Sequence, residues 1–362
     1  MKICFDYEIF WKEKFSSIAS RYYFNLINSL LDERILNVRI FANLYINEAI
    51  EILPKQILFG KKINKRIPYT GRIIEKFNSI FCNYKINKFN PDIIHKTYYD
   101  NKIKKNNAKV VLTVFDLWHE KNFNCKYLPK KYSLNISDHI LCPSIKTKND
   151  LVDIYNIDPK KISITYFGIE QFGEKFKDTK IEVFSKPFIL YVGKRERYKN
   201  FINFIKAFSN SHQLKKDFNI ICFGGGPFTK NEKDLFVNYN ISEIVLNSKN
   251  NEDLYLYNLY KNAKCLVYPS LHEGFGLPPL EAMSLGCPVI SSNHEAILEA
   301  VSDAASLFNP LEIDDITRAL INTIYSNDKI NKLKEKGFIQ ANKFSWKKCA
   351  IETIKIYGKV LN

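Results

Sequence analysis

The sequence predicts an α/β fold in which two domains are each built on a sheet of parallel strands. Its 362 residues are enough for two domains of about 150 residues each. Short apolar runs alternate with longer segments of helical periodicity, which is the order typical of parallel sheets. Hydrophobic residues make up 46% of the chain, enough for two cores. The expected division is a first domain over 1–170, a second over 171–343 and a C-terminal helix over 344–362.

The first half of the chain predicts short strands with helices between them. The expected strands are 2–5, 38–42, 91–95, 109–114, 138–143 and 161–165. A helix is expected over 18–31, because Ile18, Tyr22 and Leu26 recur at helical spacing. Residues 44–90 are expected to be mostly helical. A charged, irregular stretch over 168–186 marks the domain boundary.

The second half repeats the same alternation. The expected strands are 188–193, 219–223, 244–246, 265–268, 288–291 and 304–308. The expected helices are 201–208, 252–261, 313–326, 328–343 and 347–360. The two halves share a plan of elements but no repeated sequence.

Polar residues follow several expected strands of the first half, where ligands bind in α/β sheets. His95 and Tyr98 follow one strand and are candidate ligand contacts, although a lone strand-end His is more often a packed residue. Asp116 and His119 follow the next strand and are candidate binding or catalytic residues, with helix capping as the alternative for Asp116. Ser17 precedes the helix over 18–31 and is a further candidate.

Residues 268–293 read as a strand, a glycine loop, a helix and a second strand. A glycine loop that opens into a helix exposes backbone N–H groups at the positive end of the helix dipole, which favours an anion. Two acids bracket this loop, Glu273 within it and Glu281 inside the helix. Carboxylates there suit hydroxyl groups on either side of a phosphate, so a diphosphate with a sugar at each end fits. The alternative is a pair of solvated surface acids.

A cluster of cations over 194–199 lies between a strand and the helix that follows it. Cations normally favour the C-terminal end of a helix, so a bound pyrophosphate would explain their position. Arginine offers a fork of donors and lysine a point charge, and both suit phosphate. Arg195 and Lys199 are the candidates, and a solvated basic loop is the alternative.

The segment 268–293 resembles the acid, seven residues, acid pattern of family 4 retaining glycosyltransferases. The resemblance implies the GT-B fold, with two Rossmann-like domains facing across a cleft and a C-terminal helix crossing back to the first domain. It implies that Glu273 and the loop of Gly274, Phe275, Gly276 and Leu277 face the transferred sugar. It also implies a ribose contact for Glu281, and a diphosphate clamp of Arg195 and Lys199.

Further roles follow from the same resemblance. The nucleobase and ribose would lie beside Gly225, Leu246 and Asn247, and Asp116 and His119 would join Glu273 in the catalytic cleft. The candidates on the acceptor side would be Ser17, His95 and Tyr98. Two positions depart from the family pattern. Many members carry a Gly-Gly pair where this chain has Ser16-Ser17, and many carry a His where it has Phe115.

The resemblance also suggests substrates. The Pro278 to Met283 segment and the basic loop resemble bacterial mannosyl- and deoxyhexosyltransferases of surface polysaccharide assembly. The expected donor is therefore GDP-mannose or a related GDP-sugar, with UDP-sugars next, and the expected acceptor is a glycan, free or lipid-linked. No metal is expected, because two cations and a helix dipole would supply the positive charge.

The net charge of +16 favours an anionic partner such as a membrane surface, although compositional bias toward lysine explains part of it. No C-x-x-C pair is present, and Cys4, Cys142, Cys222 and Cys265 lie in apolar runs, as expected in a reducing compartment. A cytoplasmic protein, peripheral on the inner face of the membrane, is the expectation. Three other classes are alternatives: a glycoside hydrolase, a nucleic-acid-binding module and a non-catalytic nucleotide-sugar binder. No nucleic-acid motif is apparent.

Overall fold

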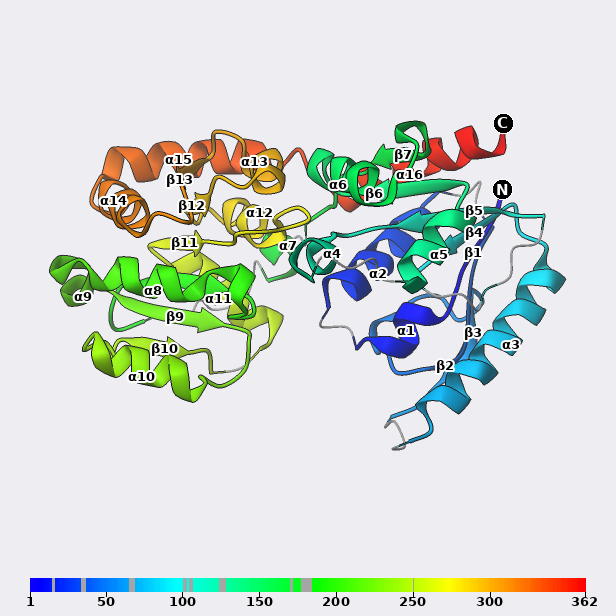
Figure 1. Ribbon diagram of the computed structural model, residues 1–362, viewed down its shortest axis with the longest axis horizontal. Coiled ribbons are helices and arrows are strands. Elements are labelled where there is room, and N and C mark those ends of the chain that lie inside the picture. The colour runs from blue at the N-terminus through cyan, green and yellow to red at the C-terminus, as the bar shows by residue number, and fades with distance from the viewer. Residues whose placement is uncertain are drawn as a thin grey trace. The chain divides into compact units, whose positions relative to one another are not determined.

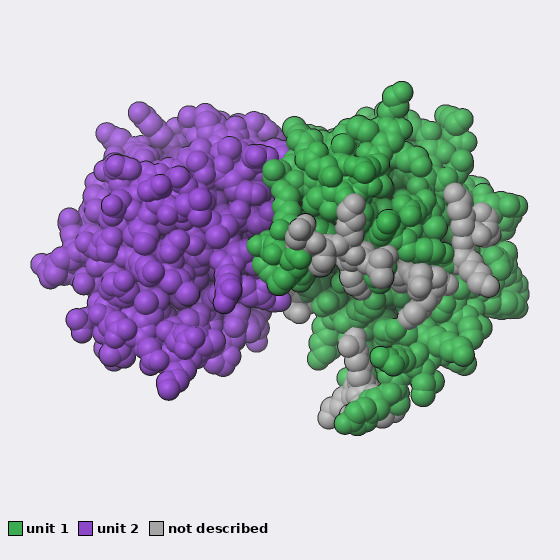
Figure 2. All heavy atoms as spheres, in the orientation of Figure 1, with its two compact units in different colours: residues 1–168, 345–362 green, residues 169–344 purple. Residues whose placement is uncertain are grey.

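In a computed structural model of the protein, the chain folds into two compact units. The structure describes residues 1–14, 17–33, 37–64, 69–99, 103, 107–123, 128–169, 172–176, 184–249 and 251–362. Unit 1 contains Met1–Gly168 and Ser345–Asn362, and unit 2 contains Ile169–Phe344 (Figure 2). The C-terminal segment therefore returns to the unit in which the chain begins.

The described part of unit 1 holds a sheet of seven parallel strands in the order β3-β2-β1-β4-β5-β6-β7. The strands are β1 (Lys2–Phe5), β2 (Asn37–Tyr45), β3 (Leu58–Lys62), β4 (Ile93–Lys96), β5 (Lys109–Thr113), β6 (His139–Cys142) and β7 (Ile162–Ile164). Their apolar side chains form a core with the helices, as expected for a sheet covered on both faces.

The expectation of a mostly helical segment over 44–90 is wrong in its first part. Strand β2 continues to Tyr45, and β3 pairs with it at the edge of the sheet. Gly60 makes this pairing possible, since a Cβ built there would lie 1.6 Å from the carbonyl oxygen of Ala42. The sequence Leu-Phe-Gly-Lys-Lys has no alternation of apolar and polar residues, so it carries little strand signal.

Helices cover both faces of the sheet in unit 1. They are α1 (Glu8–Lys12), α2 (Ile18–Leu31), α3 (Gly71–Phe89), α4 (Trp118–Phe123), α5 (Leu128–Ile136), α6 (Ile145–Tyr155) and α16 (Trp346–Leu361). Helix α2 packs against α16, whereas α3 packs against β2 on the other side of the sheet (Figure 1). Helix α2 lies in the β1–β2 connection and α3 in the β3–β4 connection, and these two connections run in opposite directions across the sheet. Because both crossovers are right-handed, the two helices lie on opposite faces.

The described part of unit 2 holds six parallel strands in the order β10-β9-β8-β11-β12-β13. The strands are β8 (Phe188–Val192), β9 (Asn219–Phe223), β10 (Val245–Asn247), β11 (Cys265–Tyr268), β12 (Val289–Ser292) and β13 (Ala305–Phe308). The helices are α7 (Phe172–Lys175), α8 (Phe201–Ser209), α9 (His212–Asp217), α10 (Lys230–Asn238), α11 (Asp253–Asn262), α12 (Leu277–Ser284), α13 (Glu295–Val301), α14 (Ile313–Ile324) and α15 (Asn327–Ala341). The strand order reverses between β8 and β11, and in unit 1 between β1 and β4.

His95, an acceptor-side candidate, lies in the core of unit 1. Its ring is fully buried, with Nδ1 2.6 Å from the Tyr357 hydroxyl of α16 and Nε2 2.9 Å from Oγ1 of Thr113. It also stacks on Phe5 at 5.2 Å between ring centroids. Burial lowers the pKa of His95 to about 3. This geometry contradicts the acceptor role and fits the packed alternative, in which His95 ties α16 to the sheet.

The buried His95 makes stability dependent on pH. The unfolded chain binds a proton on this imidazole near pH 6.5, whereas the folded chain, with a His95 pKa of about 3, does not do so until much lower pH. Stability from the neutral ring is therefore complete above about pH 6.5 and is lost as pH falls toward 3. Between pH 7.5 and pH 5, urea unfolding of unit 1 is expected to lose about 2 kcal/mol through this residue.

The matched comparison is His95→Gln against His212→Gln, since His212 is exposed on α9. The first variant is expected to lose most of the acid-induced destabilisation, and the second to keep it. Equal pH dependence in the wild type and His95→Gln would contradict the assignment.

Candidate functional site

The candidate site lies at the carboxyl edge of the sheet in unit 2. Three loops start there from neighbouring strands, 193–200 after β8, 224–227 after β9 and 269–276 after β11. The strand order reverses between β8 and β11, and ligands of open α/β sheets bind at such a point. Topology therefore brings together the basic loop, the glycine turn and the acidic loop that the sequence singled out.

Glu273 and Lys199 form a close ion pair across the reversal point. Lys199 Nζ lies 2.6 Å from Glu273 Oε1, and the two side chains are 12% and 10% exposed. The Tyr268 hydroxyl, at the end of β11, donates to the same oxygen at 2.6 Å. The backbone N–H of Leu271 donates to the carbonyl of Tyr198 at 2.7 Å, which holds the two loops together. A cation, a hydroxyl and a carboxylate thus meet at one point.

The electrostatics keep this carboxylate ionised. Burial raises the pKa of Glu273, but the Lys199 ammonium and the hydrogen bonds from Lys199 and Tyr268 outweigh it, so the net pKa lies below the usual value. Burial and the adjacent Glu273 both raise the pKa of Tyr268, which remains a donor. Glu273 is therefore suited to accept hydrogen bonds and to hold negative charge, not to donate a proton.

The N-terminus of α12 follows directly. Gly276 precedes the helix with φ +131° and provides no side-chain cap, and Pro278 and Pro279 occupy the first turn. The preceding Phe275 is buried and packs on Phe344 at 5.4 Å between ring centroids, which fixes the loop. A helix start without a capping side chain leaves backbone N–H groups and the positive dipole end for an anion. The predicted anion site at Gly274 to Leu277 therefore lies at a helix start that has no side-chain cap, and anion binding there stays a prediction.

Glu281 lies further along α12 and has its own partner. Its side chain is buried, and Oε2 accepts a hydrogen bond of 3.1 Å from the Tyr260 hydroxyl of α11. The two carboxylates of the pattern thus have separate surroundings, Glu273 beside Lys199 and Glu281 beside Tyr260. This separation fits contacts with two different hydroxyl-bearing groups.

Arg195 has different partners from Lys199. Its Nε donates to Oε1 of Glu232 at 2.7 Å, and its Nη1 donates to the carbonyl of Gly224 at 2.9 Å. Its Nη2 donates to the carbonyls of Gly226 at 2.8 Å and Pro227 at 3.0 Å. The side chain is only 4% exposed. These contacts hold the guanidinium against the glycine turn, and the clamp of Arg195 and Lys199 on one diphosphate stays a prediction.

The glycine turn is shaped around this guanidinium. Gly225 has φ +74°, and a Cβ there would lie 2.7 Å from Nη1 of Arg195, so both conformation and space require glycine. Asn247 Nδ2 donates to the carbonyl of Gly226 at 3.0 Å, and the neighbouring Leu246 is 40% exposed. The structure therefore brings together the three residues predicted to contact ribose and base, on a turn braced by Arg195.

The candidates of unit 1 lie at the carboxyl ends of β4 and β5. Asp116 Oδ1 accepts from the backbone N–H of Trp118 at 3.1 Å, so it does cap the start of α4. His119 is exposed, with its ring 4.9 Å from that of Trp118. Tyr98 is partly buried, and Lys12 Nζ lies 4.6 Å from its ring centre.

Ser17 acts as the N-cap of α2. Its side chain accepts from the backbone N–H of Ser20 at 3.2 Å, which assigns it a structural contact. Ser16, the other half of the departure from Gly-Gly, lies outside the described residues.

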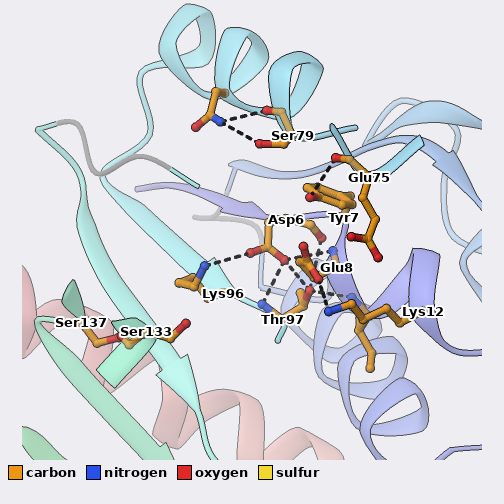
Figure 3. A network of polar contacts seen from close by, with 12 residues as sticks. Asp6, Tyr7, Glu8, Lys12, Glu75, Ser79, Lys96, Thr97, Ser133 and Ser137 are labelled. Carbon is orange, nitrogen blue, oxygen red and sulfur yellow. Dashed lines mark hydrogen bonds and ion pairs between the residues drawn. The ribbon is translucent and has the colours of Figure 1, made fainter. Parts of the chain in front are cut away.

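A buried charged network that the sequence reasoning missed lies at the end of β1 (Figure 3). Asp6 accepts from the backbone N–H groups of Thr97 at 3.1 Å and Glu8 at 3.3 Å, and Lys96 Nζ lies 3.9 Å from its Oδ2. Glu8 pairs with Lys12 at 2.7 Å. Asp6, Lys96 and Glu8 are fully buried, so the network fixes the two strands at which the sheet of unit 1 reverses. The sequence could have indicated this network, because Asp6 directly follows the apolar strand β1 and Lys96 ends the apolar strand β4.

In unit 2 the sequence reasoning also missed Tyr268, Tyr260 and Glu232. Tyr268 contacts Glu273, Tyr260 contacts Glu281, and Glu232 contacts Arg195. Tyr260 and Glu232 are distant in sequence from the residues they contact, so only Tyr268, five residues before Glu273, could have been found from the sequence nearby.

Comparison with solved structures identifies the class. The chain is similar to sucrose-phosphate synthase from Thermosynechococcus elongatus, with a TM-score of 0.76 and 16% identity over 99% of this chain and 98% of that one. It is similar to WaaG, a glycosyltransferase involved in lipopolysaccharide biosynthesis, with a TM-score of 0.70 and 14% identity over 99% of each chain. Anabaena HepE in complex with UDP gives a TM-score of 0.73 and 12% identity over 99% and 100%. The fold is that of the GT-B glycosyltransferases.

Family models define the membership further. Residues 19–171 match the family described as Glycosyltransferase Family 4, and residues 173–340 match that described as Glycosyl transferases group 1. Together the two matches run from residue 19 to residue 340, apart from residue 172. The chain consists of the two domains that these glycosyltransferase models describe, a Glycosyltransferase Family 4 domain and a Glycosyl transferases group 1 domain. Within the described residues, no helix combines the length and the apolar character needed to cross a membrane.

Several curated relatives are mannosyltransferases. O-antigen chain mannosyltransferase B of Escherichia coli is 40% identical over 27% of this chain and 26% of that protein. O-antigen chain mannosyltransferase RfbU of Salmonella typhimurium is 30% identical over 56% of this chain and 55% of that protein. The MMP α-(1→4)-mannosyltransferase of Mycolicibacterium hassiacum is 34% identical over 38% and 33%. The matched stretches thus span between about a quarter and about half of these relatives' lengths.

The bracing role of Arg195 predicts a stability effect. Arg195→Met leaves the buried Glu232 carboxylate without its cationic partner and frees the carbonyls of the glycine turn. Loss of one partner of a buried pair costs about 3 kcal/mol. Denaturant unfolding of unit 2 is expected to show this loss.

Arg197→Met, an exposed position on the same loop, is the control and is expected to change stability by less than about 0.5 kcal/mol. Similar effects of the two substitutions would refute the bracing role.

Proposed function

We propose that the protein is a retaining hexosyltransferase that takes its sugar from a nucleoside diphosphate sugar. The acceptor is a glycan, free or lipid-linked, in the synthesis of a surface polysaccharide or lipopolysaccharide. The observation that carries the proposal is the Lys199–Glu273 pair beside the uncapped N-terminus of α12. It combines a cation, a hydrogen-bond acceptor and an anion-binding helix end, which are the groups that a diphosphate with an attached sugar requires.

The proposed chemistry is electrostatic. As the bond from the sugar to the diphosphate breaks, negative charge develops on the leaving phosphate. Lys199 and the N–H groups of Gly274 to Leu277 stabilise this charge, and such preorganised stabilisation is usually the largest single catalytic term. No metal ion is needed in this scheme, because these groups supply the positive charge. Glu273 accepts hydrogen bonds from the sugar and Glu281 from the ribose, and neither acts as a base.

The donor is proposed to carry mannose or a related deoxyhexose on GDP. Relatives named as mannosyltransferases support the sugar, and two of those cited here are named for the O-antigen chain. A UDP-sugar is the alternative within the same fold, supported by the HepE complexes with UDP and with UDP-glucose. Retention follows the family and is proposed to proceed by attack on the same face of the sugar that the leaving group departs from.

Acceptor binding is assigned to unit 1. Tyr98, Asp116 and His119 lie at the carboxyl ends of adjacent parallel strands, where ligands of such sheets bind. His119 is the exposed titratable group among them.

We place the reaction in the cytoplasm, on the basis of the cysteine usage described above. A binding-only relative is the second candidate, favoured by Phe115 in place of the usual His and by the capping role of Ser17.

The nucleotide is identified by thermal shift against GDP, UDP, ADP, dTDP and their common sugars. A ligand at 100 times its dissociation constant adds about 2.7 kcal/mol to stability. We expect GDP and GDP-mannose to give the largest shift and Lys199→Ala to lose it, because Lys199 faces the anion-binding turn. Lys194→Ala is the matched control, on the same loop and 72% exposed, and it is expected to keep the shift. No shift with any nucleotide in folded protein would refute the donor site.

Transfer is tested by release of GDP from GDP-mannose in the presence of a bacterial fraction of lipid-linked oligosaccharides. Glu273→Gln keeps the shape of the side chain but removes its charge and its pairing with Lys199, and is expected to lower kcat by about 10²- to 10³-fold. Glu196→Gln, an exposed acid on the neighbouring basic loop, is the control and should retain full activity. Full activity of Glu273→Gln would reject the assignment. Nucleotide binding by the wild type without turnover would favour the binding-only candidate.

A further inference from the structure

We propose that the outward face of α3 docks on the surface of an anionic lipid bilayer. Ile73, Phe77, Ile80 and Tyr84 of this helix are 70%, 60%, 61% and 60% exposed. Their spacing of four, three and four residues places them in one stripe along the helix. A contiguous exposed apolar stripe of this kind marks an interaction surface.

Packing within unit 1 does not account for the stripe. The buried residues of α3 are Asn78, Cys82 and Ile86, which lie on the opposite side of the helix. The side-chain amide of Asn78 makes two hydrogen bonds to the backbone of Leu44 in β2. Its oxygen accepts from the N–H of Leu44 at 2.8 Å, and its nitrogen donates to the carbonyl of Leu44 at 2.9 Å. One face therefore fixes α3 to the sheet, and the second apolar face is left for a partner.

The charges around the stripe are positive. Arg72, Lys76 and Lys88 are exposed, and on the helical projection Lys76 and Lys88 fall on either side of the stripe. The one acid of α3, Glu75, is turned the other way, since it raises the pKa of Lys12 in α1 and its backbone carbonyl accepts from the Tyr7 hydroxyl at 3.3 Å (Figure 3). Compositional bias toward lysine does not explain cations that flank an apolar stripe.

This combination fits an interfacial helix. Apolar and aromatic residues on one face with lysine and arginine at its margins is the pattern of helices that lie in the plane of a bilayer. The stripe from Ile73 to Tyr84 is roughly 16 Å long, which suits lying on the surface. A second copy of the chain is a poorer occupant, because pairing two α3 faces would bring their cations together.

Docking through α3 places a particular edge of unit 1 at the lipid. The N-terminal half of α3 lies beside Tyr7, which follows β1, and beside Lys12, whose ammonium contacts the ring of Tyr98. Ile73 and Phe77 therefore belong to the carboxyl edge of the sheet, where the acceptor candidates lie. A lipid-linked acceptor would be presented there. This consequence rests on the proposed function, whereas the docking itself does not.

The experiment is co-sedimentation of the full chain with vesicles, without nucleotide or acceptor. Phosphatidylcholine vesicles are compared with vesicles of phosphatidylcholine and phosphatidylglycerol at 3:1. We expect binding to the anionic vesicles only, weakened by added salt. Phe77→Ser with Ile80→Ser, and separately Lys76→Glu with Lys88→Glu, are each expected to lower the partition coefficient at least about tenfold.

Two double variants with similar exposure serve as controls. Val237→Ser with Ile339→Ser removes apolar side chains that are 64% and 65% exposed, and Lys332→Glu with Lys334→Glu reverses two exposed lysines of α15. Both are expected to leave the partition coefficient unchanged, and circular dichroism and the melting temperature check the fold of every variant.

Three results would overturn the proposal. The first is equal binding to the two kinds of vesicle, or no binding to either. The second is binding that the α3 variants reduce no more than the control variants do. The third is a protein that does not bind vesicles but forms a dimer, which Phe77→Ser with Ile80→Ser dissociates. Failure of vesicle binding leaves the nucleotide and transfer tests intact, so the two proposals fail separately.

Discussion

The ion pair between Lys199 and Glu273 is the interaction on which the candidate site depends. It joins the loop after β8 to the loop after β11, on the two strands between which the sheet order reverses. Both groups are nearly buried, so either one alone would leave an unpaired charge in a low dielectric. The pair therefore holds the basic loop against the loop that precedes α12 and keeps a cation beside the predicted anion site.

Arg195 shows that the cations of one loop have different tasks. Its donors hold the glycine turn and Glu232, so it shapes the surface on which Gly225, Leu246 and Asn247 lie. Lys199, four residues later, faces the acidic loop instead. A cluster of positive residues before a helix thus combines one residue that holds the glycine turn with one that pairs with the acidic loop, and the sequence pattern alone does not distinguish them.

Local signals were enough for most of the fold and for the centre of the site. Apolar runs located the strands of unit 2, and the glycine loop with Pro278 and Pro279 located the β11–α12 turn. Strand β3 was missed because its stability comes from Gly60 fitting against Ala42, a contact that leaves no periodicity. His95 was misassigned, and the partner of Arg195 was missed, for a related reason. Their partners, Tyr357 and Glu232, come from distant elements, and only the folded chain shows that their polar atoms are already bound.

Net charge illustrates the same limit. A total of +16 says little about partners, because some lysines serve the interior. Lys96 is fully buried beside Asp6, and Lys130 pairs with Glu120 at 2.8 Å. Those on α3 differ, since Lys76 and Lys88 are exposed at the margins of an apolar stripe that the sheet does not use. Position relative to apolar surface, rather than the number of cations, is what separates a lysine that stabilises the fold from one available to an anionic surface.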